Sequence, residues 1–320
     1  MWCTMTRYPL FCILLTAISV ASTRGAEPSS EKLPYLVRVG LVADDPAAPA
    51  AVPEEAKSCE GVTLTRNLRY GGSEQNVLDI ATGSAANDLA ISRPVLLFVA
   101  GDSFSAENAA PDVHATMHDT AMCFAARHGM VGVRMSYRLA PANPWPSGAR
   151  DVAAATSWLH QNVELFGGNR DEIVAVGYSV GAFHVASLLA HPEFQITDSD
   201  VAAAVLVSGI YRAGADASAQ EKSYFGADAS QYDQRSAFPG ILTIKTPLLL
   251  AWSMQDPPRL VAESEVLKQR LCDSPTHCPR STVLGYRESL ASMFEADASG
   301  GSLAEPTLEL VREIEARGLP

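Results

Sequence analysis

Along most of this 320-residue chain, short apolar runs alternate with longer segments whose apolar residues recur at helical spacing. The apolar runs are rich in Val, Ile and Leu and have the length of strands. Because parallel strands need a crossover connection, this alternation predicts an α/β fold, with a mostly parallel sheet and helices on both faces. The expected strands are residues 62–69, 76–80, 94–99, 131–136, 173–176, 201–207, 247–252 and 281–284, and the expected helices are residues 112–128, 149–165, 182–190, 259–271 and 305–317.

One strand-to-helix junction carries a chemically distinctive pentapeptide, Gly177-Tyr178-Ser179-Val180-Gly181. The apolar run 173–176 ends directly before it, and the helical run 182–190 begins directly after it. Flanking glycines permit the strained turn that exposes a nucleophilic hydroxyl at such a junction. The pattern therefore predicts Ser179 as a nucleophile. The alternative is that Ser179 only caps the N-terminus of the following helix.

Two other expected strands end in polar loops. Residues 100–104, which include Asp102 and Ser103, follow the strand 94–99, and Asp256 follows the strand 247–252. In a parallel sheet the carboxyl ends of the strands meet at one edge, where ligands bind. Both loops are therefore expected beside Ser179, although Asp256, which precedes Pro257, also suits an ordinary turn.

Further motifs are spread over most of the chain. They are Leu78-Asp79-Ile80, Tyr137-Arg138-Leu139-Ala140-Pro141, Pro144-Trp145-Pro146, Asp151-Val152, Phe166-Gly167-Gly168-Asn169-Arg170 and Tyr224-Phe225-Gly226. With the Ser179 pentapeptide and Asp256, they resemble the signature of hormone-sensitive-lipase-type and feruloyl-esterase-like α/β hydrolases. The order of serine before acid is also that of α/β hydrolases.

This resemblance implies a single α/β-hydrolase domain over residues 27–320 and hydrolysis of carboxylic esters through a serine acyl-enzyme. It assigns Ser179 as the nucleophile and Asp256 as the acid of the triad. The main-chain amides of Val180, Asp102 and Ser103 are the corresponding oxyanion-hole donors. The implied substrates are small-molecule or polysaccharide-linked esters, including acetyl and feruloyl esters, and no cofactor is implied.

Two segments depart from the family pattern. Ala100-Gly101-Asp102-Ser103 stands where the family has His-Gly-Gly-Gly, and the Asp102 carboxylate would oppose a developing oxyanion if it faced the site. Gly285-Tyr286-Arg287-Glu288-Ser289 stands where the family has its triad histidine, so Glu288 occupies the position of the base. If Glu288 approaches Asp256 in a partly desolvated cleft, the two carboxylates would share a proton, and one could act as the base.

Two other functions stay open. An inactive relative would use the same pocket to bind an ester, glycan or protein without turnover. Alternatively, Gly101-Asp102-Ser103-Phe104 resembles the Gly-Asp-Ser block of a different serine-hydrolase family. Those enzymes need Asp-x-x-His later in the chain, and Asp273 and His277 are one residue too far apart.

The histidines and cysteines offer no clear metal site. His114 and His118 share a helical face, with Asp119 beside them, but no third convergent ligand is evident. His277 is expected in a surface loop, and His184 is expected to pack or cap within the helix after Ser179. Cys272 and Cys278 could close a short disulfide loop, and a metal site with His277 is the less favoured alternative.

The N-terminus has the features of a secretory signal peptide. Arg7 precedes the apolar stretch 9–20, which is too short to span a bilayer, and small residues suit cleavage near Ala21 or Ala26. Removal of residues 1–26, which contain two arginines and no acid, leaves 22 basic against 36 acidic residues, a net charge of −14. A secreted or periplasmic protein without a transmembrane segment is expected, and its acidity disfavours nucleic acid or anionic lipid as a partner.

A polar, Gly- and Ala-rich insert at about residues 211–240 is expected to overlie the site. Its aromatic residues either line an acyl or aromatic pocket or form the insert's own small core, which is the favoured interpretation. They are Tyr224, Phe225, Tyr232 and Phe238.

Overall fold

The computed structural model describes residues 59–83, 92–101, 103–108, 113–196, 200–214, 216–274, 278–285, 293–294 and 301–318. For residues 108, 113–118 and 318 only the backbone is described. The predicted signal peptide and the segment that contains Glu288 lie outside the described residues. Within these ranges, no helix has both the length and the apolar character that a membrane span requires.

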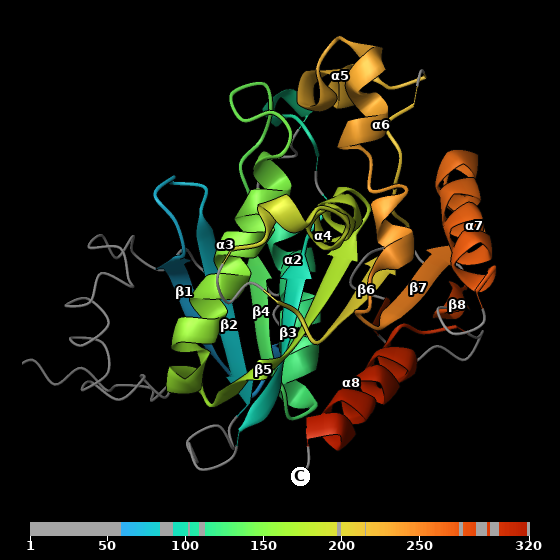
Figure 1. Cartoon of the computed structure of the whole chain (residues 1–320). Coiled ribbons are helices and arrows are strands. Elements are labelled where there is room, and N and C mark those ends of the chain that lie inside the picture. The colour runs from blue at the N-terminus through green and yellow to red at the C-terminus, as the bar shows by residue number, and fades with distance from the viewer. Residues whose placement is uncertain are drawn as a thin grey trace, which may run out of the picture.

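The strands form one eight-stranded sheet of order β1-β2-β4-β3-β5-β6-β7-β8 (Figure 1). β2 is antiparallel to both β1 and β4, and every other pairing in the sheet is parallel. The predicted mostly parallel sheet is thus confirmed. The strands are β1 (Val62–Arg69), β2 (Val77–Gly83), β3 (Arg93–Val99), β4 (Val131–Met135), β5 (Gly168–Tyr178), β6 (Ala203–Val207), β7 (Leu248–Ser253) and β8 (Arg280–Leu284).

Helices cover both faces of this sheet. All five expected helices are present, and further short helices build the insert. They are α2 (Val113–Arg127), α3 (Ser147–Asn162), α4 (Val180–Ala190), α7 (Pro258–Cys272) and α8 (Ala304–Gly318), with α5 (Ala219–Phe225), α6 (Tyr232–Arg235) and η7 (Gly240–Thr243) in or next to the insert. The insert lies at the end of the sheet toward which the parallel strands point (Figure 1).

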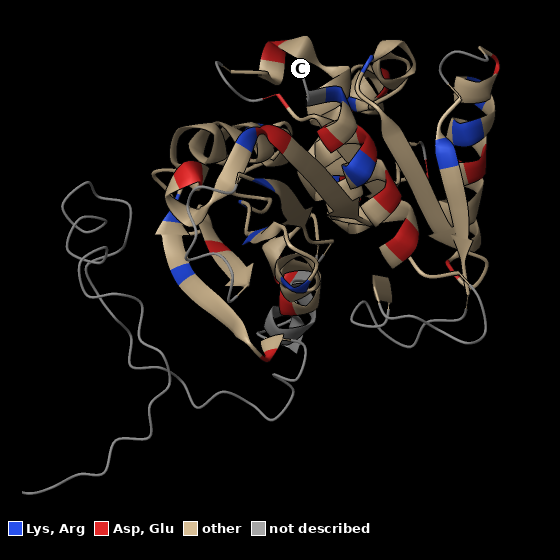
Figure 2. Cartoon of the chain, turned by 90° about the horizontal axis from the view of Figure 1, so that it is seen from below, with Lys and Arg blue, Asp and Glu red and all other residues tan. Residues whose placement is uncertain are grey.

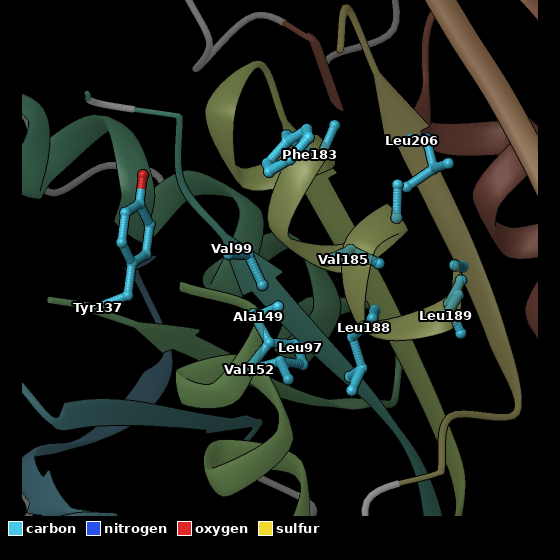
Figure 3. Packing of buried hydrophobic residues seen from close by; sticks show 14 of the residues in the cluster. Leu97, Val99, Tyr137, Ala149, Val152, Phe183, Val185, Leu188, Leu189 and Leu206 are labelled. Atoms are coloured by element: carbon cyan, nitrogen blue, oxygen red, sulfur yellow. The ribbon is translucent and has the colours of Figure 1, made fainter. Parts of the chain in front are cut away.

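Alternate residues of each central strand enter different cores. Along β3, Leu97 belongs to the core under α3 and α4, whereas Leu96 and Phe98 belong to the core under α2 and α8. Figure 3 shows side chains of the first core gathered between sheet and helices, among them Leu97, Val152 and Leu188. Burial on both faces explains why these strands are continuous apolar runs instead of alternating patterns.

Two disulfides fasten outer segments to this sandwich. Cys59 is bonded to Cys123 of α2 across 64 residues, and Cys272 is bonded to Cys278 across six. The second bond confirms the predicted short loop and removes both thiolates from the alternative metal site. Within the described part of the chain, no group of three or more His, Cys, Asp or Glu residues could hold a metal ion.

A four-residue ion network stabilises the antiparallel edge. Arg66 binds both Asp79 and Asp119, with N–O distances of 2.9 and 2.5 Å, and Arg134 binds Asp79 at 2.7 Å. Burial disfavours the charge of Asp79, but Arg134 and Arg66 together hold the pKa of its carboxyl below the ordinary value. Elsewhere, acidic and basic residues are interspersed along the helices (Figure 2).

Candidate active site

Ser179 lies on the sharp turn between β5 and α4. Its φ of 52° and ψ of −114° place a non-glycine residue in a strained backbone conformation. Ser179 is the N-cap residue of α4, yet among the described residues its side chain makes no capping hydrogen bond. The strain is therefore not explained by helix capping, and the turn has the geometry of a nucleophile elbow.

Close backbone contacts require the glycines around this serine. A Cβ on Gly181 would lie 2.0 Å from the carbonyl oxygen of Val99, at the end of β3. A Cβ on Gly101 would lie 2.6 Å from the Cβ of Ser179 and 2.2 Å from the carbonyl oxygen of Tyr178. The loop after β3 is thus packed directly on the Ser179 turn, where an oxyanion loop is needed.

Asp256 follows β7 and is held by donors from two strand ends. Its Oδ2 accepts a hydrogen bond of 2.6 Å from the hydroxyl of Ser208 and one of 2.9 Å from the backbone N–H of Ser253. Asp256 is partly exposed. Its side chain is therefore fixed through one oxygen, as expected of an acid that orients a base and unlike a freely solvated turn residue.

The nucleophile turn and the acid are connected through the end of β6. The backbone N–H of Ser179 donates to the carbonyl of Val207 at 2.8 Å, and the next residue, Ser208, binds Asp256. Burial, and secondarily the charge of Asp256, raises the pKa of Tyr178, the residue before the nucleophile. The structure thus brings the predicted nucleophile and the predicted acid to one edge of the sheet.

The loop after β3 is only partly described, because Asp102 lies outside the described residues. Ser103 is 2% exposed; its hydroxyl donates to Oε1 of Gln220 in α5 at 3.2 Å and accepts from the backbone N–H of Ser105 at 3.0 Å. Tyr137 donates its hydroxyl to the carbonyl of Ala100 at 2.9 Å. A buried Ser103 hydroxyl with two partners disfavours the alternative in which Ser103 is the nucleophile.

Glu288, the predicted replacement for the triad histidine, lies outside the described residues. The last described residue before it is Gly285, whose carbonyl lies 3.5 Å from the hydroxyl of Ser253 and accepts a hydrogen bond from it. The chain therefore leaves β8 beside the residue whose amide binds Asp256. The role of Glu288 stays a prediction.

His184 is buried in α4, as expected for a packing residue. Its ring centroid lies 4.6 Å from that of Tyr137, 5.4 Å from Tyr224 and 5.8 Å from Phe104. Burial lowers the pKa of His184 to about 3, so the imidazole is neutral. In the described ranges neither ring nitrogen of His184 has a hydrogen-bond partner.

The other described histidines serve the scaffold. His128, His160 and His191 each have a ring nitrogen within 2.9 Å of a main-chain carbonyl oxygen. Across the described part of the chain, no histidine is hydrogen-bonded to Ser179 or Asp256. His277 and the side chains of His114 and His118 lie outside that part.

Three of the four aromatic residues of the insert are buried, but they join the core under α3 and α4 and do not form the separate small core that was favoured from the sequence. Tyr224 and Phe225 are fully buried, and the Tyr224 ring stacks on Phe104 of the loop after β3 at 4.9 Å. Tyr232 is also buried, whereas Phe238 is partly exposed beneath the guanidinium of Arg212. This core is shared with the sheet domain, so the insert is packed firmly on the loop after β3.

Ser208 and Gln220 were not predicted from the sequence as site residues. Ser208-Gly209 follows an apolar strand and reads as an ordinary strand end. Its position at the carboxyl end of a central strand was the available signal.

Comparisons with known proteins agree with this geometry. Residues 93–243 match the model of a family with the α/β-hydrolase fold. The chain is 32% identical over 158 residues to esterase LipQ of Mycobacterium tuberculosis, covering 46% of this chain and 35% of LipQ. It is also 32% identical over 132 residues to the probable carboxylic ester hydrolase LipM of the same organism, covering 39% of this chain and 29% of LipM. The chain thus spans about a third of the length of these relatives.

Solved structures show the same fold at low identity. An inhibited esterase B of Lactobacillus rhamnosis aligns with a TM-score of 0.63 at 16% identity, over 80% of this chain and 86% of that chain. A truncated carbohydrate esterase from gut microbiota aligns with a TM-score of 0.62, also at 16% identity, over 79% and 96% of the two chains. With the sheet order, the strained serine turn and the match over residues 93–243, these likenesses lead to one conclusion: the chain has the α/β-hydrolase fold.

Proposed function

We propose that this protein hydrolyses carboxylic esters through an acyl-enzyme on Ser179. The observation that carries the proposal is the strained Ser179 turn, joined through the end of β6 to a carboxylate held by two donors. The similarity to LipQ and LipM, both described as ester hydrolases, supports the same activity.

In the proposed reaction, the Ser179 hydroxyl attacks the acyl carbon as its proton passes to a base. The amide of Val180, at the start of α4, and amides of the loop after β3 stabilise the oxyanion. Collapse breaks the bond to the alcohol, which leaves with the proton. Water then attacks the acyl-enzyme, activated by the same base, and releases the acid and free Ser179.

We assign the base to Glu288, since it occupies the position of the family histidine and Gly285 lies beside Ser253. A carboxylate near Asp256 would share a proton with it. Because a base acts only when it is deprotonated, turnover is expected to rise with pH as the shared proton is lost and then to level off.

Hydrolysis of p-nitrophenyl acetate by four proteins tests this assignment. Relative to wild type, Ser179→Ala is expected to lose nearly all turnover, since loss of a triad nucleophile costs about a million-fold in kcat. Glu288→Gln is expected to abolish turnover, and Glu288→His is expected to preserve or raise it. Equal rates for wild type and both Glu288 variants would overturn the base assignment while leaving the nucleophile in place.

An inactive binding protein is the second candidate. It is favoured by the finding that, within the described ranges, no histidine is bonded to Ser179 or Asp256. An inactive relative would bind p-nitrophenyl acetate or acetylated xylan in wild type and Ser179→Ala alike, with no release of acetate from either. Release of acetate from xylan would instead support polysaccharide-linked substrates.

We also propose that the protein is exported and then cleaved near Ala21 or Ala26. The two disulfides support an oxidising compartment, where such bonds persist. N-terminal sequencing of the secreted or periplasmic protein tests this directly, and an N-terminus at Met1 in a cytoplasmic fraction would contradict it.

A further inference from the structure

Ser208, directly after β6, has an unusual conformation and a buried side chain. Its φ is 50°, and it is one of three non-glycine residues with positive φ in the described part of the chain, together with Asn67 and Ser179. Ser208 is 2% exposed. A serine in this region is sterically disfavoured and persists only where its surroundings require that conformation.

The conformation satisfies two hydrogen bonds at once. The backbone N–H of Ser208 donates to the carbonyl of Ala251 in β7 at 2.8 Å, which continues the parallel pairing of the two strands. The side chain donates from Oγ to Oδ2 of Asp256 at 2.6 Å. At the end of β6, Ser208 therefore keeps its backbone hydrogen bond to β7 while its hydroxyl points toward Asp256.

Both donors to Asp256 meet the same oxygen atom. The amide of Ser253 donates to Oδ2 at 2.9 Å, so Oδ2 is held from the ends of β6 and β7 together. None of the described residues donates a hydrogen bond to Oδ1. One carboxylate oxygen of Asp256 is therefore fixed, and no described donor holds the other.

The residue before Ser208 contacts the nucleophile. The carbonyl of Val207 accepts the backbone N–H of Ser179 at 2.8 Å. Two consecutive residues at the end of β6 therefore touch the nucleophile turn and the acid. A shift of either residue would change the spacing between the two catalytic groups, and small errors of this kind lower rates strongly.

We propose that Ser208 is a positioning residue: its hydroxyl, fixed by a strained backbone, orients Asp256 so that the remaining carboxylate oxygen faces the base. This inference rests on the proposed ester hydrolysis and extends it. Ser208 acts on the reaction through Asp256 and is assigned no contact with the substrate.

Loss of the hydroxyl leaves Asp256 with the Ser253 amide as its described donor, so the carboxylate is free to rotate. Because the change affects orientation and not substrate contacts, kcat is expected to fall by about 10- to 100-fold while KM changes by less than about twofold. A general loss of structure would instead lower the concentration of active enzyme and the melting temperature together.

The test compares wild type, Ser208→Ala, Ser208→Gly and Thr156→Val by p-nitrophenyl acetate kinetics and thermal melting. Glycine accepts the positive φ, so Ser208→Gly removes the hydroxyl without backbone strain and provides a variant that folds. Thr156→Val is the matched control, because it removes a buried hydroxyl that donates only to the Val152 carbonyl within α3, at 2.9 Å. We expect low kcat in both Ser208 variants and wild-type kcat in Thr156→Val.

Three results would overturn the inference. Wild-type kcat in Ser208→Ala and Ser208→Gly would show that the hydroxyl does not orient the acid. Wild-type kcat in Ser208→Gly alone would show that only the backbone conformation matters. An inert wild-type protein would instead refute the proposed ester hydrolysis, and the inference with it, so the two failures are distinguishable.

Discussion

Acidification is expected to destabilise this protein through one buried histidine. His184 is 1% exposed, and its imidazole is enclosed by the rings of Phe104, Tyr137, Phe183 and Tyr224. Burial lowers its pKa in the folded protein to about 3, whereas an unfolded chain has the ordinary value of about 6.5. Below pH 6.5 the unfolded state therefore binds a proton that the folded state does not, and stability is lost as the pH falls toward 3.

The size of the effect follows from these two values. Each pH unit between them costs about 1.4 kcal/mol, so lowering the pH from 7 to 5 removes about 2 kcal/mol of unfolding free energy through His184 alone. His184→Leu, an apolar substitution of similar volume, removes the titration. The free-energy difference between wild type and His184→Leu should therefore shift by about 2 kcal/mol in favour of the variant between pH 7 and pH 5.

Urea unfolding of both proteins at several pH values measures this shift. Taking the difference between the two proteins cancels the groups that titrate in both. The slope against urea must stay the same in both proteins, so that only stability is compared. A difference that stays constant from pH 7 to pH 5 would contradict this prediction, since it would mean that His184 titrates alike in the folded and unfolded states.

Three other perturbations have defined outcomes. Gln220→Leu removes the acceptor of the Ser103 hydroxyl and should lower kcat several-fold in an ester hydrolysis assay. The control Gln234→Leu, at an exposed position of the insert, should not lower kcat. Equal rates for both variants would show that the insert does not hold the loop after β3 in place. Asp79→Asn removes one of the two carboxylates that bind both Arg66 and Arg134, while Asp119 keeps the other; because these arginines are 34% and 23% exposed, a cost of about 1–2 kcal/mol is expected by urea unfolding, and unchanged stability would contradict a stabilising network. Replacing Cys59 and Cys123 by Ala should cost about 4 kcal/mol, against about 2 kcal/mol for Cys272 and Cys278, because the first bond closes 64 residues and the second six; the reverse order would refute the loop-entropy argument.

Periodicity was sufficient to predict the fold. The apolar runs were long and their spacing regular, so all eight strands and all five long helices lie where the pattern places them. Their ends were less accurate. β5 begins at Gly168, five residues before the predicted strand, because Arg93 and Gly168 pair outside the apolar run.

The position of a site residue was predictable only where that residue lies directly after a strand or in the loop that follows it. Ser179 and Asp256 follow this rule, and the structure brings both to one edge of the sheet. Ser208 and Gln220 were not predictable, because the hydrogen bonds that distinguish them are to partners 48 and 117 residues away. In the sequence, a serine before a glycine indicates neither a positive φ nor the carboxylate to which its hydroxyl will donate. Such contacts depend on strand register, which a single sequence does not reveal.

Covalent labelling tests most directly whether Ser179 is an activated nucleophile. The purified protein and Ser179→Ala are incubated with a fluorophosphonate between about pH 5 and pH 10, and adducts are located by intact-mass and peptide mass spectrometry. We expect a single adduct on Ser179 of the wild type and none on Ser179→Ala. An adduct on Ser103, or no adduct at any pH, would contradict the assignment of Ser179 as an activated nucleophile.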